Sequence, residues 1–321
     1  MHWMDRLVVA GSRHERIYPR LFPDGWGDLD VLGRYREPVR TLMPTAQVEL
    51  DWIPASSRDE LLVWDASFPS PAPDLPEAAR SAHLRMVSPV LKPDRIVLLM
   101  AAFNDHGYST RSLLARHLAR RGIASVMLEN PLYGRRRANA HKQATRTVLD
   151  LLIMGKAATI EGASVLDALR RSGDARLGVS GYSMGGNIAA LVGSVITFPV
   201  ALAPLAPPHS PGPVFAEGVL SRTVKWASLG GLDRREDLGK ILGSASALHF
   251  PAPPHTAHAV LAAPYGDGYV PRQAVEDLNR HWPGSELRWL AGGHASLWMF
   301  GKAQLAAAVD ESFVRLAGSN Q

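Results

Sequence analysis

The sequence predicts an α/β protein with a mostly parallel, doubly wound sheet and a small cap insertion. Three observations support this prediction. From residue 95 onward, short apolar runs of strand length alternate with longer stretches of helical spacing. These runs lack polar alternation, which is typical of strands buried on both faces of a parallel sheet. The chain has 321 residues, of which 46% are hydrophobic and 20% charged, enough for one large domain with its own core.

The first ninety residues differ from the rest, since they are rich in proline, tryptophan and aspartate. Apolar residues between 7 and 21 have helix-like spacing, and strands are expected at 60–64 and 83–87. The proline-rich run 68–73 between these strands predicts an extended loop, because proline fixes its own φ and lacks a backbone N–H.

The regular alternation of strands and helices begins at residue 95. The strands are continuous apolar runs, and the helices place apolar residues three and four positions apart. One long helix is expected to be broken near Gly155. The expected strands are 96–100, 123–128, 177–180, 198–202, 259–263 and 287–290, and the expected helices are 109–120, 143–171, one after Ser183, 272–281 and 296–316.

Residues 206–256 interrupt this alternation with prolines, a candidate helix at 214–227 and a charged turn at 233–237. An insertion at this point would sit above the strand ends, so we expect a small cap and not a second domain. The predicted organisation has four parts. Residues 1–90 contain the N-terminal helix and the first strands, 91–205 form the core half that includes Ser183, 206–256 form the cap, and 257–321 form the core half that includes Asp267 and His294.

Composition and motifs exclude several function classes. The net charge is only +5, and the arginines stand in short bursts between apolar stretches, which is typical of solvated charge and not of a nucleic-acid track. The absence of cysteine excludes disulfides, a thiolate nucleophile and iron–sulfur clusters. No nucleotide-binding loop and no His/Asp cluster at metal spacing occur, so we expect neither a cofactor nor a metal.

The beginning of the chain does not resemble a secretory signal, because only a few apolar residues precede Arg13 and Glu15, and a cytoplasmic protein is expected. The uncharged stretch 184–208 is long enough to span a membrane. It contains Asn187 and four prolines, however, which favours a buried helix, a turn and a buried strand. The sequence leaves the oligomeric state and contact with a membrane surface open.

The pentapeptide Gly181-Tyr182-Ser183-Met184-Gly185 fits the pattern Gly-x-Ser-x-Gly between an expected strand and an expected helix. Such a turn needs small residues on either side of the serine, because the backbones approach closely there. The pattern predicts Ser183 as a nucleophile. A Gly-rich turn whose serine merely caps the helix is the alternative.

A serine hydroxyl needs a base to remove its proton, and the base needs a carboxylate to orient it. Asp267 and His294 follow the expected strands 259–263 and 287–290, in the chain order serine, acid, histidine. We therefore expect Ser183, Asp267 and His294 to form a catalytic triad, with Glu217 as the competing acid.

The oxyanion formed by attack on a carbonyl needs two preorganised N–H donors. The first is expected from Met184, the residue after the nucleophile, and the second from the loop that follows strand 96–100. Within that loop we favour Phe103 over Ala102. Asp105 and His106 in the same loop are expected to make stabilising hydrogen bonds and not to bind a metal.

Six segments of the sequence have a familiar pattern. They are Phe22–Gly27, Asp105–Tyr108, Leu128–Gly134, the turn at Ser183, Gly218–Ser221 and Trp282–His294. With these segments the sequence resembles the α/β-hydrolase domain-containing protein 18 family over nearly its whole length. This resemblance implies an α/β-hydrolase fold with Ser183, Asp267 and His294 as its triad. The chain lacks the long polar insertion that animal members carry between the cap and the acid strand, which suggests a compact, bacterial-type member.

Two polar segments near the expected site have two interpretations each. Glu129 and Asn130 either form a polar wall of the pocket or fix the turn at Pro131. The run 135–137 is all arginine, and either meets an acidic or phosphate-bearing head group or remains ordinary solvated charge.

The function expected from the sequence is a serine esterase that acts on a hydrophobic, lipid-like ester. Apolar residues at 214–220 in the cap and 298–300 after His294 motivate the hydrophobic substrate, although they could equally pack the cap onto the core. Two alternatives are an acyltransferase that uses the same acyl-enzyme, and a non-catalytic binding protein on a hydrolase fold.

Overall fold

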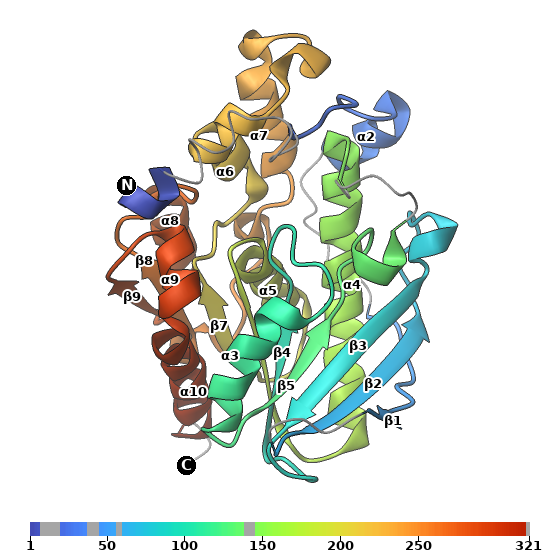
Figure 1. Ribbon diagram of the computed structural model, residues 1–321, viewed down its shortest axis with the longest axis vertical. Helices are drawn as coiled ribbons and strands as arrows, with labels where there is room; N and C mark the ends of the chain where they lie inside the picture. Colours follow the sequence, from blue (N-terminus) through green and yellow to red (C-terminus); the bar gives the residue numbers. More distant parts are fainter. Residues whose placement is uncertain (7–19, 37–44, 56–59, 138–144, 319–321) are drawn as a thin grey trace.

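A computed structural model describes residues 1–6, 20–36, 45–55, 60–137 and 145–318 (Figure 1). Its centre is a nine-stranded sheet in the order β1-β2-β3-β5-β4-β6-β7-β8-β9. The strands are β1 (Ile53–Pro54), β2 (Leu62–Pro69), β3 (Ser81–Ser88), β4 (Arg95–Met100), β5 (Ala124–Leu128), β6 (Arg176–Tyr182), β7 (Ala201–Leu205), β8 (Val260–Pro264) and β9 (Glu286–Leu290).

The sheet is antiparallel at one edge and parallel elsewhere. Strands β1, β2 and β3 pair antiparallel, and β3 pairs antiparallel with β5. From β5 through β9 every pair is parallel. This arrangement confirms the predicted α/β fold with a mostly parallel sheet, and it brings the carboxyl ends of β4 to β9 to one edge.

Helices cover both faces of the sheet (Figure 1). They are α2 (Leu29–Arg36), α3 (Ser109–Ala119), α4 (Val148–Ser172), α5 (Met184–Val195), α6 (Pro211–Ala216), α7 (Arg235–Gly243), α8 (Arg272–His281), α9 (His294–Phe300) and α10 (Lys302–Gly318). The side chains of β4 alternate between two apolar clusters. Leu98 and Met100 share a cluster with residues of α4, α5 and α8, whereas Val97 and Leu99 share one with residues of α3 and α10. Both faces are therefore apolar, which explains the apolar run of β4 in the sequence.

Several expected boundaries were wrong. The helix α4 continues through Gly155 without a break, and it begins at a capping box in which Thr147 and Asp150 bond each other's backbone N–H. The single helix expected at 296–316 is two helices, α9 and α10, separated by Gly301. Strand β7 starts three residues later than expected, after Pro199, whose missing N–H disfavours a central strand.

The region 206–256 also differs in detail from the expectation. The candidate helix 214–227 is the short helix α6 followed by 3₁₀ turns, and the charged turn at 233–237 leads into α7. Figure 1 shows α6 and α7 beyond the carboxyl ends of the parallel strands. The limits 206–256 for a cap, and the other expected divisions of the chain, remain predictions.

Helix α2 and strand β1 were not anticipated, and most of the helix expected between residues 7 and 21 lies outside the described residues. Within the part of the chain that the structure describes, no helix is both long and apolar enough to cross a membrane. The uncharged stretch 184–208 consists of α5, a connection and β7, as its prolines indicated.

Candidate active site

Ser183 lies at the sharp turn between β6 and α5. Its backbone has φ 60° and ψ −119°, a region that residues with a Cβ rarely adopt. A Cβ on Gly181 would lie 2.5 Å from the carbonyl oxygen of Gly185, so the first glycine of the pentapeptide is required by close backbone approach. The Ser183 N–H donates to the carbonyl of Leu205 at 2.8 Å, which ties the turn to β7.

Asp267 and His294 follow β8 and β9 and contact each other. His294 Nδ1 lies 2.7 Å from Asp267 Oδ2. The other carboxylate oxygen of Asp267 accepts the N–H groups of Tyr269 and Val270 at 2.8 and 2.9 Å. Because an ionised carboxylate only accepts hydrogen bonds, this contact places a proton on Nδ1 and leaves Nε2 of the neutral imidazole to accept a proton.

Two tyrosine rings contact the His294 imidazole. Tyr269 stacks on it with ring centroids 4.8 Å apart, and the centroid of Tyr182 is 4.9 Å away. The Tyr182 hydroxyl also donates to the His294 carbonyl at 2.7 Å. Burial raises the pKa of Tyr182 well above its ordinary value, and the charges of Asp267 and Asp5 raise it further, so this phenol stays neutral.

The N–H groups expected to form an oxyanion hole come from the start of α5 and from the loop after β4. Met184 is the first residue of α5, so its N–H has no acceptor within the helix. In the loop, Asn104 N donates to Tyr133 Oη and Asp105 N donates to Ala102 O, both at 3.2 Å. These bonds occupy the neighbouring amides, which favours Phe103 or Ala102 as the second donor.

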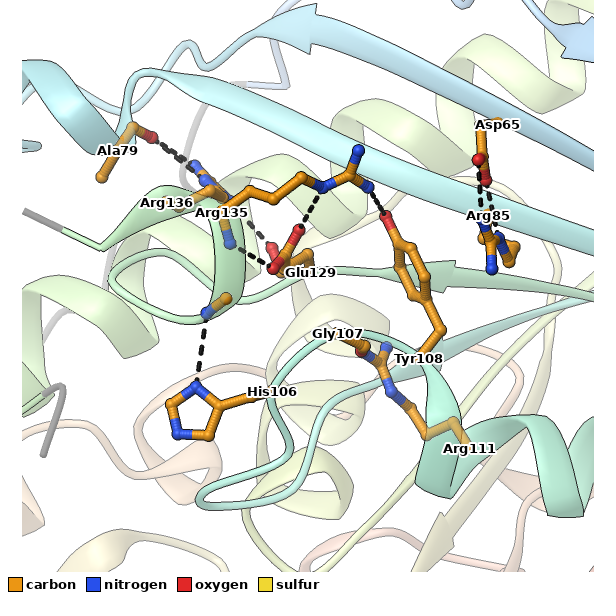
Figure 2. Close-up of polar contacts among 11 residues, drawn as sticks. Asp65, Ala79, Arg85, His106, Gly107, Tyr108, Arg111, Glu129, Arg135 and Arg136 are labelled. Carbon is orange, nitrogen blue, oxygen red and sulfur yellow. Dashed lines mark hydrogen bonds and ion pairs between the residues drawn. The ribbon is translucent and has the colours of Figure 1, made fainter. Parts of the chain in front are cut away.

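The buried side chain of Arg111 holds this loop in place (Figure 2). Arg111 donates to the Asp105 carboxylate and to the carbonyls of Leu99, Gly107 and Leu128, each at 2.7 Å. The loop is thereby tied to the ends of β4 and β5. Asp105 makes the stabilising contacts expected of it, and no group of three His, Asp or Glu side chains in the described residues is placed to hold a metal ion.

Aromatic side chains join the cap region to the loop after β4. Phe215 of α6 packs edge-on against Phe103 and against Phe22, with centroid distances of 5.8 and 5.6 Å. Phe22 and Phe215 are buried, whereas Phe103 is partly exposed. Met184 and Tyr269 pack against the same apolar cluster.

Glu217, the competing acid, lies at the end of α6. It lines a surface depression of about 500 Å³ together with Asp267, Arg222 and Arg235. His294 Nδ1 contacts Asp267 and not Glu217. The geometry therefore favours Asp267 as the acid that orients His294.

Arg135 and Arg136 have different surroundings, so the three consecutive arginines cannot act as one patch (Figure 2). Arg136 is fully buried and pairs with the equally buried Glu161, with 2.5 Å between Nη2 and Oε1. Arg136 also donates to the carbonyls of Ala79 and Glu129, so it links three segments of the core. The interpretation of all three as solvated or substrate-facing charge was wrong for Arg136, because a single sequence carries no signal for a buried arginine.

The flanking residues support the same local structure. Glu129 is buried, accepts the backbone N–H of Arg135 at 2.8 Å, and lies 3.5 Å from the Arg135 Nε. Arg135 is half exposed and donates to the Tyr108 hydroxyl at 3.1 Å. These contacts favour the interpretation that Glu129 fixes the turn. Asn130 is buried too, and its side-chain amide has no hydrogen-bond partner within the described part of the chain.

Comparison with solved structures supports the fold. An acetyl xylan esterase from Paenibacillus sp. R4 aligns with a TM-score of 0.58 and 16% identity, covering 90% of this chain and 96% of that one. Acetyl xylan esterase 1 from Thermoanaerobacterium sp. JW/SL YS485 gives 0.55 and 14%, covering 91% and 98%. A cold-adapted esterase from an Arctic intertidal metagenomic library gives 0.53 and 16%, covering 82% and 99%.

At these identities the likeness shows a shared fold. The family assignment comes from a sequence model, described as alpha/beta hydrolase domain containing 18, which matches residues 19–245 and 233–315. The two matched ranges together include the Ser183 turn, Asp267 and His294, and they span most of the chain. The protein belongs to the alpha/beta hydrolase domain containing 18 family.

Proposed function

We propose that the protein is a serine hydrolase that cleaves carboxylic esters through an acyl-enzyme on Ser183. The observation that carries this proposal is the 2.7 Å contact between Asp267 and His294 at the strand edge that also presents the strained Ser183 turn. Membership of an α/β-hydrolase family supports it, as does the esterase name of the three structures that share the fold.

The proposed reaction has two halves, acylation of Ser183 and deacylation by water, and His294 acts as base and then as acid in each. His294 Nε2 takes the Ser183 hydroxyl proton while Oγ forms a bond to the ester carbonyl carbon. The N–H groups of Met184 and Phe103 would donate to the resulting oxyanion. The bond to the leaving alcohol then breaks, and His294 gives the alcohol its proton. Water then attacks the acyl carbonyl carbon while His294 takes its proton. The bond to Ser183 Oγ breaks, His294 returns the proton to Oγ, and the carboxylic acid leaves.

The substrate in this proposal is a hydrophobic ester. Phe103 is partly exposed, packs edge-on against Phe215 of the cap region, and shares an apolar cluster with Met184, which suits an acyl chain more than a charged group. An acyl chain of a lipid is one group of this kind.

Labelling with a fluorophosphonate probe tests the proposed nucleophile. We expect the native protein to be labelled and to hydrolyse p-nitrophenyl esters, and we expect Ser183→Ala to lose both activities while keeping its fold by circular dichroism. Labelling that persists in the variant would place the nucleophile elsewhere. A native protein that binds esters but neither reacts with the probe nor turns them over would favour the non-catalytic alternative.

A further inference from the structure

The first residues of the chain pack against the two loops that carry Asp267 and His294. The N–H of His2 donates to the carbonyl of Gly266 at 2.9 Å, next to the acid. Asp5, three residues further on, is fully buried. A segment far away in the sequence thus lies against both loops of the proposed triad.

The Asp5 carboxylate accepts three backbone N–H groups. Its Oδ2 accepts from Gly268 at 3.0 Å and from His294 at 2.9 Å, and its Oδ1 accepts from Ala295 at 3.0 Å. Gly268 directly follows the acid, and His294 is the histidine itself. One oxygen atom of Asp5 therefore bridges the loop of Asp267 to the loop of His294.

These contacts also complete the start of α9. His294 and Ala295 are its first two residues, and their N–H groups have no acceptors within the helix. Capping side chains normally come from the residue just before a helix, but that residue here is Gly293, which has no side chain to offer. Asp5 supplies the missing oxygens from elsewhere in the chain.

The glycines of both loops leave room for this approach. A Cβ on Gly293 would lie 2.6 Å from Asp5 Oδ2, and a Cβ on Gly268 would lie 2.6 Å from Met1 Sδ. No real Cβ comes so close, so larger residues would push the segment away. The Gly-Asp-Gly and Gly-Gly-His sequences thus provide a binding surface for residues 1–5 in addition to their turns.

Burying an aspartate without a cation is costly, and among the described residues no Lys, Arg or His side chain pairs with Asp5. The three hydrogen-bond donors that Asp5 has among the described residues all belong to the loops that hold Asp267 and His294. A carboxylate whose only role was to stabilise the N-terminal segment could use any exposed backbone N–H groups.

We propose that Asp5 is a positioning residue for the triad. By tying Gly268 to His294, it fixes the distance between the two loops and so maintains the 2.7 Å contact between Asp267 and His294. The kinetic consequence of this role rests on the proposed function, whereas the structural consequence does not.

The kinetic test compares Asp5→Ala and Asp5→Asn with the control Asp28→Asn. Asp28 also caps a helix, accepting the N–H groups of Asp30 and Val31 at 3.0 Å, but it caps the exposed helix α2. We expect kcat per labelled active site to fall about 100-fold in Asp5→Ala with KM nearly unchanged, because displaced catalytic groups slow the chemical step. Asp5→Asn keeps one oxygen and should fall between Asp5→Ala and the native protein.

The structural test follows the Nδ1 proton of His294 by NMR, which needs no substrate. A proton held between imidazole and carboxylate gives a strongly downfield signal, and His294→Gln assigns it. The signal should persist in Ser183→Ala and Asp28→Asn and should shift or broaden in folded Asp5→Ala or, if that variant does not fold, in Asp5→Asn. Native-like signals and native-like kcat in the folded Asp5 variants would overturn the proposal. A displaced signal in a protein without esterase activity would overturn the proposed function alone.

Discussion

Asp267 illustrates at the scale of one residue how a carboxylate sets the state of a base. Both of its oxygens are engaged, one by His294 and one by the N–H groups of Tyr269 and Val270. These backbone donors hold the Asp267 carboxylate in place, and the carboxylate in turn orients the His294 imidazole.

Asp267→Asn should therefore leave the fold intact and reduce kcat by about 10⁴-fold, as in the general Ser-His-Asp template, because an amide N–H facing Nδ1 favours the wrong tautomer of His294. Steady-state kinetics on a p-nitrophenyl ester measures this loss. Glu217→Gln is the control and should retain near-native kcat. The reverse result would assign the acid role to Glu217.

The charge of Arg136 stabilises the fold and has no proposed role in the reaction. Its charge is fully buried opposite Glu161 and links α4 to the segments around Ala79 and Glu129. We expect Arg136→Gln to lower the free energy of unfolding by about 3–5 kcal/mol, since it leaves the Glu161 carboxylate buried without its partner. Arg170 pairs with Asp167 on the surface with half of its side chain exposed, and Arg170→Gln should cost less than about 1 kcal/mol. Urea denaturation of both variants measures the difference, and equal losses would contradict it.

At the scale of elements, local sequence patterns predicted the strands of the parallel sheet well and the cap poorly. The strands β4, β5 and β8 are mainly apolar runs that Gly, Pro or charged residues delimit, so their signal is local. The strands β6 and β9 also contain polar or charged residues, yet the expected ranges 177–180 and 287–290 lie within them. Helix α7 begins in a run of charges, and α6 has only six residues, so neither carries a clear periodic pattern. Their formation depends on packing against α2 and on the aromatic contacts of Phe215, which a single sequence does not reveal.

The cap region is also the element from which we predict substrate preference. Phe215→Ala removes the ring that packs against Phe103, so kcat/KM for a long-chain p-nitrophenyl ester should fall about tenfold more than kcat/KM for the acetate ester. Leu232→Ala, at an exposed position in the same region, should leave kcat/KM unchanged for both esters. Parallel losses on both esters would show that Phe215 only packs the cap onto the core.

At the scale of the whole molecule, the sequence points to the residues for which we propose direct chemical roles more readily than to those proposed to support them. Ser183, Asp267 and His294 stand beside glycines after apolar strands, which is a local pattern. Asp5 lies 289 residues from His294, and its role depends on where the N-terminal segment packs. Arg111 sits within a helix and gives no signal that its side chain reaches the ends of two strands. Such support residues require knowledge of the tertiary structure.

The titration of the folded molecule leads to a prediction about acid stability. His255 is buried, and neither of its ring nitrogens has a hydrogen-bond partner among the residues that the structure describes. Burial lowers its pKa from 6.5 to about 4. Between these two values the unfolded chain binds a proton that the folded protein excludes, so stability is complete above pH 6.5 and falls as the pH decreases to about 4.

His255→Leu removes this titration and should change the shape of the stability curve. The unfolding free energy of the native protein should fall more steeply between pH 6.5 and pH 4 than that of the variant, by up to about 3 kcal/mol. Urea denaturation at a series of pH values measures both curves, and the difference between the two proteins at pH 7.5 accounts for any change in packing. Curves that stay parallel down to pH 4 would mean that His255 gains its proton equally in the folded and unfolded states. The loss of stability at low pH would then come from carboxylates whose pKa is lowered by arginine partners, such as Asp65 and Asp167.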